Sequence, residues 1–423
     1  MAAVISGAVM AAGPLPDLGV LGSADRNDGF AQVLEPRTFE FPRDHGPHPQ
    51  YRQEWWYVTG NLDGAGGERF GVELTFFRFA LAPLPGRPAA RVGTRAATAG
   101  EEERAGEGER EDGGRQSRWR ARQIYMAHFA VTDVGRKRFR FAQKLSRDAL
   151  GLAGAVESEG GQEAGQAGGK KVGEGAGKGE GQRVGKDEEQ GSLRVWIDDW
   201  YLRAVLPEAT EWSLHAAENG YELTLNAQVS VAPVLNGERG LSRKSSEPGS
   251  ASYYYSIPRV TVRGRLVRDG KPVDVHGMAW VDREWGSGTL GRGEQGWDWF
   301  ALELQDGNSL MFYALRNRDG GWDPHSAGTW VSADGESRAL AGDQVRINVE
   351  DYWKSPRGGR YPARWRVRVP AEGIDLDVRP ALPDQELTTS PRYWEGAVDV
   401  AGTSRGRETQ GRGYVELVGY GAQ

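Results

Sequence analysis

Short stretches in which apolar and polar residues alternate run through most of the chain. Arg69–Leu81 (RFGVELTFFRFAL) and Gln123–Thr132 (QIYMAHFAVT) alternate in this way and are rich in β-branched and aromatic residues, which is typical of strands with a face in a core. Further segments of this character are Arg194–Leu202, Tyr221–Val231, Arg259–Leu266, Gly296–Leu304, Ser309–Arg316, Trp365–Val369 and Gly413–Gly419. Turn sequences such as DGAGG after Leu62 and QDGNS after Leu304 separate them. Because no long amphipathic helix is indicated, the pattern predicts an all-β protein with a sandwich or barrel in each half.

Two low-complexity segments interrupt the predicted strands of the first half. They run from about Pro83 to Ser117 and from about Gly154 to Gly191, and both are rich in glycine and charge with almost no large apolar residues. Such segments cannot bury enough surface to offset the entropy of ordering, so we predict disordered loops inserted into the first domain. A milder break, residues 235–250, has the composition of a linker. We therefore expect a leader or flexible N-terminus over 1–36, an N-terminal β domain over 37–240 and a C-terminal one over 241–423.

Composition narrows the classes of function. The 15 tryptophans among 423 residues favour wide apolar clefts with polar edges. A net charge of -6 gives no basic footprint, which argues against a nucleic-acid partner. No stretch approaches the ~20 apolar residues that cross a bilayer, while peripheral association with a membrane stays open. The absence of cysteine excludes disulfides, a thiol nucleophile and cysteine-based metal sites.

The N-terminus bears on location. The stretch AAVISGAVMAAG is small and apolar, like the tail of a signal peptide, but no basic region precedes it. We expect the protein in the cell envelope or secreted, with the cytoplasm as the alternative.

Three clusters combine aromatic and charged residues. In the first, QEWWYVTG, strand periodicity places Glu54 and Trp56 on one face, and Arg78 shares a face with Phe76 on the following strand. One interpretation is a buried Glu54–Arg78 ion pair, since buried charges must be paired. The other is that these groups line a ligand cleft.

The second cluster is the run Tyr253, Tyr254 and Tyr255. Consecutive positions of a strand point to opposite faces, so at least one of these rings is expected in a core. The others are candidates to reach a cavity, where a buried phenol needs a hydrogen-bond partner.

The third cluster, HGMAWVDREWG, holds the strongest candidate site. A period of two places Trp280, Asp282 and Glu284 on one face of a strand, with Trp285 on the other. The two carboxylates are either neutralised by arginines such as Arg283, or one of them is a carboxylic acid held beside aromatic rings for chemistry.

Other constellations are weaker. His45 and His48 have metal-ligand spacing but lie before the first strand without a third ligand nearby, which favours a solvated loop. Ser287 lacks the G-x-S-x-G spacing of a nucleophile elbow. The glycine-rich run Gly173–Gly181 matches neither a dinucleotide fingerprint nor a P-loop.

At these clusters the chain resembles the carotenoid 1,2-hydratases (CrtC) and the AttH-like "predicted secreted hydrolases", and it is closer to the AttH branch. The segments that carry the likeness are HPQYRQEWWYVTGNL (His48–Leu62), FGVELTFFRFAL (Phe70–Leu81), YMAHFAVTD (Tyr125–Asp133), YYYSIPR (Tyr253–Arg259), HGMAWVDREWG (His276–Gly286), GWDWFALELQDG (Gly296–Gly307) and GRGYVELVGY (Gly411–Tyr420).

The resemblance implies two lipocalin-like β domains with a hydrophobic site between or within them. The hydratases add water across an isoprenoid double bond without a metal or organic cofactor, and related fungal proteins steer cyclisations of polyenes. Their site aspartate follows an aromatic residue by two positions, which Asp282 and Trp280 match, with tryptophan in place of tyrosine. Their upstream His-x-Trp pair is best matched by Tyr253 and Tyr255, so both of its residues are replaced.

Three functions are consistent with these features. In the first, the protein is a hydratase- or lyase-like enzyme on an alkene-bearing isoprenoid or lipid: a desolvated, protonated Asp282 donates the proton, and Glu284 or Tyr253 directs the water. The expected substrate-binding residues are Trp280, Tyr255, Trp285, Trp56 and Arg78. In the second, it is a lipocalin-like carrier in the cell envelope that binds an apolar ligand unchanged. In the third, the carboxylates only brace the two domains.

Overall fold

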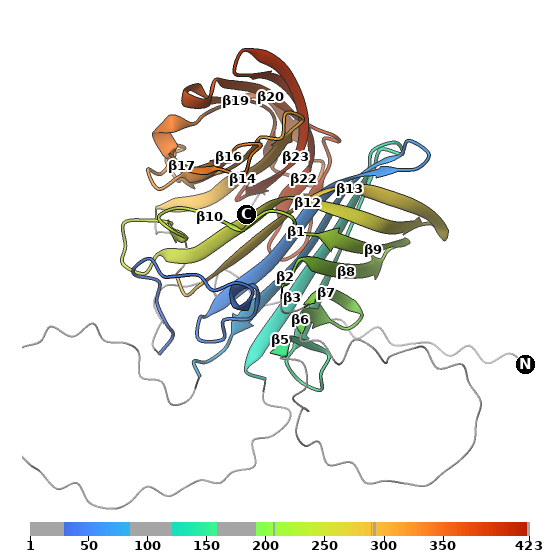
Figure 1. The fold of residues 1–423 in the computed structure, drawn as a ribbon, viewed down its shortest axis with the longest axis vertical. Coiled ribbons are helices and arrows are strands. Elements are labelled where there is room, and N and C mark those ends of the chain that lie inside the picture. Colours follow the sequence, from blue (N-terminus) through green and yellow to red (C-terminus); the bar gives the residue numbers. More distant parts are fainter. Residues whose placement is uncertain are drawn as a thin grey trace, which may run out of the picture.

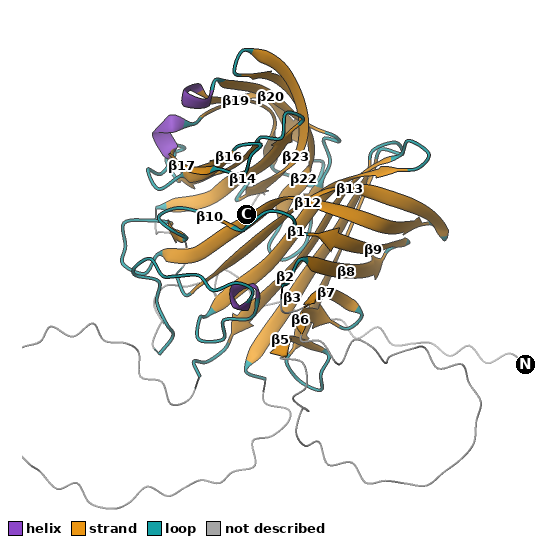
Figure 2. Ribbon diagram, in the orientation of Figure 1, coloured by secondary structure: helices purple, strands orange, loops and turns teal. Residues whose placement is uncertain are grey.

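The computed structural model describes residues 29–84, 121–158, 192–205, 208–288, 290 and 293–420. Within these residues the regular structure is nearly all β, arranged as two antiparallel sheets joined by loops (Figures 1 and 2). The predicted all-β class is therefore confirmed. The two charged insertions fall mostly on residues 85–120 and 159–191, and most of the expected leader on residues 1–28, all outside the described part. The second insertion was expected from Gly154, but the strand β5 occupies Ala153–Ser158.

The first sheet holds thirteen strands within the described residues, in the order β4-β3-β2-β1-β13-β12-β9-β8-β7-β6-β5, with β10 and β11 also paired to β12. Their bounds are β1 (Gln53–Gly64), β2 (Arg69–Ala80), β3 (Gln123–Asp133), β4 (Arg138–Arg147), β5 (Ala153–Ser158), β6 (Ser192–Ile197), β7 (Trp200–Val205), β8 (Glu211–Glu218), β9 (Tyr221–Gln228), β10 (Val234–Leu235), β11 (Leu241–Arg243), β12 (Ala251–Arg268) and β13 (Lys271–Gly286). The sheet curls into a near-barrel, because β3 and β4 approach β6 from the far end of the order. At this closure, Nζ of Lys144 on β4 lies 4.8 Å from the ring centroid of Trp200 on β7.

The second sheet forms a half-barrel of ten strands within the described residues, in the order β17-β16-β15-β14-β23-β22-β20-β19-β18, with β21 paired to β22. Their bounds are β14 (Glu294–Leu304), β15 (Ser309–Asn317), β16 (Ala327–Val331), β17 (Ser337–Ala341), β18 (Arg346–Lys354), β19 (Arg360–Val369), β20 (Ile374–Pro380), β21 (Glu386–Leu387), β22 (Tyr393–Ser404) and β23 (Arg407–Val418). Three 3₁₀ turns complete the regular structure of this part of the chain: η2 (Arg43–His45), η3 (Gly342–Gln344) and η4 (Pro370–Glu372). None of the described helical turns has the length and apolar character needed to cross a membrane.

The burial of the strands shows where the two sheets meet. Strand β9 alternates buried and exposed residues along its whole length, as expected for a strand with one face in a core and one in water. Strand β13 is exposed or only partly buried at all but one position of its first half and buried from Ala279 to Gly286, because β22 and β23 of the second sheet pack over this region and contact β2 and β1 (Figure 1). Separate apolar clusters fill the inside of each sheet, and a third, aromatic cluster lies between them.

The change from one sheet to the other falls between Gly286 and Glu294. The division expected at residues 240–241 thus lies within the first sheet, since β12 and β13 pair with β9 and β1. The predicted strand Arg194–Leu202 is two strands, β6 and β7, separated by a turn at Asp198 with φ 54°. The segment with linker composition contains β10 and β11, which fold back onto β12.

Candidate active site

Strands β1, β13 and β12 lie side by side, and their register sorts the predicted site residues onto two faces. Asp282 is opposite both Tyr57 and Ser256, whereas Arg283 is opposite Trp56 and Tyr255. Residues directly opposite in an antiparallel pair share a face, and neighbours along a strand do not. One set of side chains therefore faces the second sheet, and the other faces the inside of the near-barrel.

Asp282 lies on the face toward the second sheet and is buried. Its carboxylate accepts hydrogen bonds from Trp280 Nε1 at 2.7 Å, from the Ser256 hydroxyl at 2.5 Å and from the Tyr254 hydroxyl at 2.5 Å. Burial raises the pKa of Asp282 to about 7, although these three hydrogen bonds lower it. Because its partners are neutral donors, this carboxyl can hold or release a proton near neutral pH.

Glu284 lies two residues further along the same face, next to a lysine. Lys244 Nζ is 3.0 Å from its carboxylate, and the Ser252 hydroxyl also donates to it. Burial disfavours the charged lysine, but Glu284 and the Tyr313 phenol outweigh this and raise the pKa of Lys244. The predicted shared face of Trp280, Asp282 and Glu284 is thus present. The hydrogen-bond partners of Asp282 are neutral, whereas Glu284 lies next to a cation.

Aromatic rings surround Asp282 from both sheets. Trp299 of the second sheet donates from Nε1 to the Tyr254 hydroxyl at 3.0 Å, and its ring centroid lies 6.5 Å from that of Trp280 and 5.1 Å from that of Tyr57. These four rings belong to the aromatic cluster between the sheets. An apolar ligand next to Asp282 would lie against aromatic faces.

A group of three glutamates from three strands lies on the same interface, and sequence reasoning missed it. Glu73 of β2 accepts a hydrogen bond from Thr75 at 2.9 Å, and Glu395 of β22 accepts one from Tyr57 at 2.5 Å. Glu395 is directly opposite Glu416 of β23. Burial raises the pKa of all three carboxyls, and in Glu395 and Glu416 the neighbouring carboxylates raise it further. The interface therefore favours the protonated form of these carboxyls.

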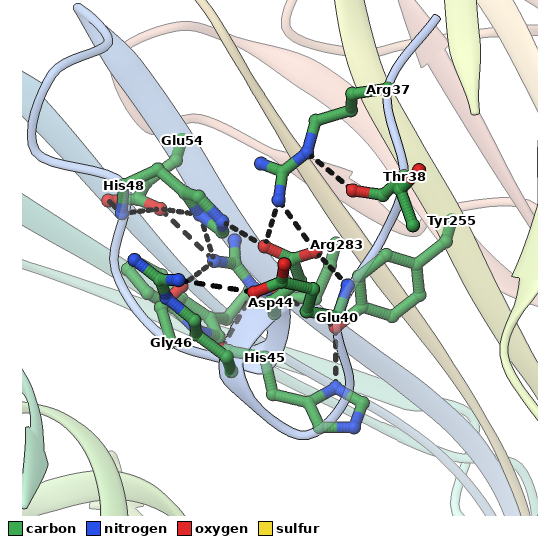
Figure 3. A network of polar contacts seen from close by, with 12 residues as sticks. Arg37, Thr38, Glu40, Asp44, His45, Gly46, His48, Glu54, Tyr255 and Arg283 are labelled. Atoms are coloured by element: carbon green, nitrogen blue, oxygen red, sulfur yellow. Dashed lines mark hydrogen bonds and ion pairs between the residues drawn. The ribbon is translucent and has the colours of Figure 1, made fainter.

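The other face of the same strands carries a buried charge network (Figure 3). Arg78 Nε donates to Glu54, and Arg283 Nη2 donates to the second oxygen of Glu54 at 3.0 Å. His48 bridges the network, with Nε2 3.1 Å from Asp44 and Nδ1 3.3 Å from Glu54. The buried Glu54–Arg78 pair predicted from the sequence is present. Arg283 joins it, and Arg283 therefore does not neutralise the Asp282 side of the strand.

Four residues expected to act beside Asp282 lie on this inner face. Tyr253 donates to the carbonyl of Glu35 at 2.9 Å, and Trp56 Nε1 donates to the carbonyl of His45 at 3.0 Å. The Tyr255 hydroxyl lies 2.6 Å from His45 Nδ1 (Figure 3). The fourth residue, Trp285, stacks on His48 with ring centroids 3.7 Å apart. Together with Arg78 they hold the segment before β1 against the barrel, and the structure does not bring them to Asp282.

The tyrosine that contacts Asp282 is Tyr254, not Tyr253 or Tyr255. The reason is the register, because a one-residue shift moves a side chain to the other face of a sheet. Ser256 and Tyr254 hence occupy the places beside Asp282 where the resemblance had suggested Tyr255 and Tyr253.

His45 and His48 are not in a solvated loop, since both are buried. Burial, with the positive charge of Arg283, lowers the pKa of His45 to about 3. No group of three or more His, Asp or Glu side chains in the described part of the chain has an arrangement suited to a metal ion. The Ser287 hydroxyl donates to the carbonyl of Ala31 at 2.6 Å, which is a structural role.

Comparison with known proteins identifies a family, a related sequence and solved structures that are similar to this chain. The model of the AttH-like family matches residues 32–164 and 171–420. The dehydratase asqC of Emericella nidulans is 24% identical over 212 residues, which are 47% of this chain and 58% of that protein, so the match spans little more than half of its length. The crystal structure of a putative AttH from Nitrosomonas europaea is 29% identical, with a TM-score of 0.70 over 92% of this chain and 100% of its own. Kievitone hydratase from Nectria haematococca is 13% identical and shares the fold, with a TM-score of 0.56 over 93% of this chain and 98% of its own.

The family match covers both sheets and includes Trp280, Asp282 and the strands that surround them. On this ground, the protein belongs to the AttH-like family.

Proposed function

We propose that this protein is a hydro-lyase, which adds water to a carbon–carbon double bond of a hydrophobic substrate or removes it, with protonated Asp282 as the proton donor. Proteins similar to it include a dehydratase, and a hydratase shares its fold. The observation that carries the proposal is the environment of Asp282, which is buried among aromatic rings with three neutral donors and has a pKa of about 7.

Such a carboxyl is suited to acid catalysis on an alkene. Efficient general acids have a pKa near the working pH, and an ordinary aspartate at its usual value of 3.8 would carry no proton to give. Protonation of the double bond produces a carbocation at the adjacent carbon. The faces of Trp280, Trp299 and Tyr254 stabilise this cation, and cation–π attraction in a dry site contributes about 2 kcal/mol or more for a well-placed ring.

Water then completes the addition. Its oxygen bonds to the cationic carbon, and the proton that it loses passes to Glu284, which Lys244 holds in place on the same face. Return of one proton to Asp282 restores the starting state, so the net change is the addition of one water. Dehydration is the same sequence in reverse.

The substrate approaches from the edge of the aromatic cluster. Trp55, Leu290 and Trp297 border the cluster there and are only partly buried, whereas Trp280 and Tyr254 are buried. Trp55 is directly opposite Glu284 in the strand pairing, so an apolar substrate that contacts these side chains would lie close to Glu284, which suits an isoprenoid or another alkene-bearing lipid.

The test is turnover of a panel of trisubstituted alkenes, and of the corresponding tertiary alcohols, in water labelled with oxygen-18. Mass spectrometry should detect addition of labelled water by the wild-type protein, and Asp282→Asn should lower the rate by at least ~100-fold, as expected for loss of a general acid. Asp298→Asn is the matched control, because Asp298 is also buried, has a pKa of about 6 and faces away from the cluster toward Arg316 and Tyr420.

Full turnover by Asp282→Asn would exclude Asp282 as the acid. Binding of these compounds without incorporation of label by the wild-type protein would instead show a carrier and contradict the proposed reaction.

A further inference from the structure

A cavity lies between the two sheets, at the other end of their interface from Trp55 and Trp297. Its volume is about 950 Å³, within the range of small-molecule sites. Residues of both sheets line it, among them Asn61 of β1, Met278 of β13 and Gln410 of β23. The cavity is separate from the proposed active site, because Met278, Trp280 and Asp282 follow at every second position of β13 and the buried Trp280 stands between the other two.

The cavity is lined by four arginines, of which three have a carboxylate partner. The pairs are Arg69–Asp399 at 2.5 Å, Arg379–Asp377 at 2.5 Å and Arg412–Asp63 at 2.8 Å. Within the described residues, Arg259 forms no ion pair with a carboxylate. Its Nη1 donates to the carbonyl of Gly307 and, at 3.4 Å, to that of Ala333, while its Nε is buried and bonds to no described group.

The backbone at Arg259 is in an unfavourable conformation. Arg259 has φ 55°, in the left-handed region, and lies where the pairing of β12 with β13 shifts register between Ile257 and Val260. A non-glycine residue in this region is strained and persists only where its surroundings determine it. Bulges of this kind often turn a side chain toward a functional site.

Glu303 contacts the backbone of Arg259 but forms no ion pair with its guanidinium. Glu303 accepts the backbone N–H of Arg259 at 2.9 Å, and burial raises the pKa of Glu303 to about 7 although Arg259 lowers it. Below that pH the lining carries four arginines against the three aspartates of the ion pairs, a surplus of one positive charge. An unpaired guanidinium in a cavity with a surplus positive charge is complementary to one anion.

We propose that this cavity binds a small organic monocarboxylate, whose carboxylate group pairs with the guanidinium of Arg259. Arginine offers two parallel N–H donors that match a carboxylate, and charge-assisted bonds of this kind are about twice as strong as neutral ones. The side-chain amides of Asn61, Gln305 and Gln410 line the same cavity and suit the polar groups of the rest of the ligand.

Binding is tested with 4-fluorobenzoate as the probe, observed by fluorine NMR below the pKa of Glu303. Its neutral counterpart, 4-fluorobenzamide, has nearly the same shape. The carboxylate should bind and the amide should not, and Arg259→Gln should weaken carboxylate binding roughly tenfold or more, as expected for loss of a charged hydrogen-bond pair.

Two further variants keep the test decisive. Arg259→Gly removes the guanidinium at a position whose positive φ suits glycine, so this variant retains the fold even if Arg259→Gln does not. Arg265→Gln removes one positive charge from an exposed position of the same strand and should leave binding unchanged. The proposal would be overturned by equal binding of 4-fluorobenzoate and 4-fluorobenzamide, by equal weakening in Arg265→Gln, or by no binding of millimolar 4-fluorobenzoate to the wild-type protein. None of these outcomes bears on Asp282.

Discussion

The substitution Asp282→Asn should remove a pH-dependent loss of stability that the native carboxyl causes. The pKa of Asp282 is about 7 in the folded protein, against an ordinary value of 3.8. Below pH 3.8 the folded and the unfolded protein both hold this proton, and the contribution of the Asp282 carboxyl to stability is fully present. Between 3.8 and 7 the unfolded chain releases the proton while the folded protein keeps it, so stability falls as pH rises, and above 7 the loss is complete.

The size of this effect follows from the shift. Each pKa unit corresponds to 1.36 kcal/mol, and a shift of about three units therefore changes the free energy of unfolding by about 4 kcal/mol across the window. Asparagine has the shape of the protonated acid but no proton to release. Its amide oxygen still accepts from Ser256 and Trp280, and its amide N–H can donate to the Tyr254 oxygen. Relative to the wild type, the variant should thus gain stability as pH rises.

The assay is urea unfolding of both proteins at about pH 4 and about pH 8, with free energies from linear extrapolation. Comparing the two proteins cancels the titration of every group that does not interact with Asp282. Asp274→Asn is the control, because the Asp274 side chain is 78% exposed and its replacement should cause no pH-dependent difference. A difference between Asp282→Asn and the wild type that is the same at both pH values would refute the reasoning.

Three further substitutions test the surroundings of the site. Glu54→Gln leaves two fully buried arginines without their carboxylate and should lower the free energy of unfolding by about 3–5 kcal/mol in urea; a loss below about 1 kcal/mol would show that the network is not held by charge. Glu416→Gln should raise the melting temperature relative to the wild type at alkaline pH but not at acidic pH, because the pKa of Glu416 is raised on folding; an equal shift at both would contradict this. Gly71→Ala would place its methyl carbon 2.6 Å from Cβ of Ala397 and should cost about 1–3 kcal/mol by forcing the sheets apart, whereas Gly135→Ala meets no atom within 4 Å and should cost little.

Periodicity was sufficient to predict part of the candidate site. Alternation along WVDREW places Trp280, Asp282 and Glu284 on one face, and their observed contacts agree. The same reasoning found the Glu54–Arg78 pair, because a charged residue at an apolar position of a strand needs a partner.

The partners of Asp282 could not be derived in this way. Strand periodicity predicts that Tyr254 points to the opposite face from Tyr253 and Tyr255. It does not predict which of the two faces carries Asp282, because that depends on the register between β12 and β13 and on the register shift after Ile257. The glutamates between the sheets were also out of reach. Glu73 and Glu395 come from different sheets, and each resembles an ordinary half-exposed strand carboxylate until the second sheet covers it.

The expected boundary at residues 240–241 does not coincide with the change from one sheet to the other. Composition marked residues 235–250 as a linker, yet β10 and β11 in this segment pair with β12. Local composition reports the tendency to be exposed and carries no information on which distant strand is the partner.

The central claim is that Asp282 is an uncharged acid near neutral pH, and infrared titration of its carboxyl tests this most directly. The difference spectrum between the wild-type protein and Asp282→Asn, with aspartate labelled with carbon-13, isolates the carbonyl band of this one group. We predict that the band of the protonated acid persists through mildly acidic pH and disappears around pH 7. A band lost near pH 3.8, the ordinary value for aspartate, would show that Asp282 is ionised at neutral pH and contradict its assignment as the proton donor.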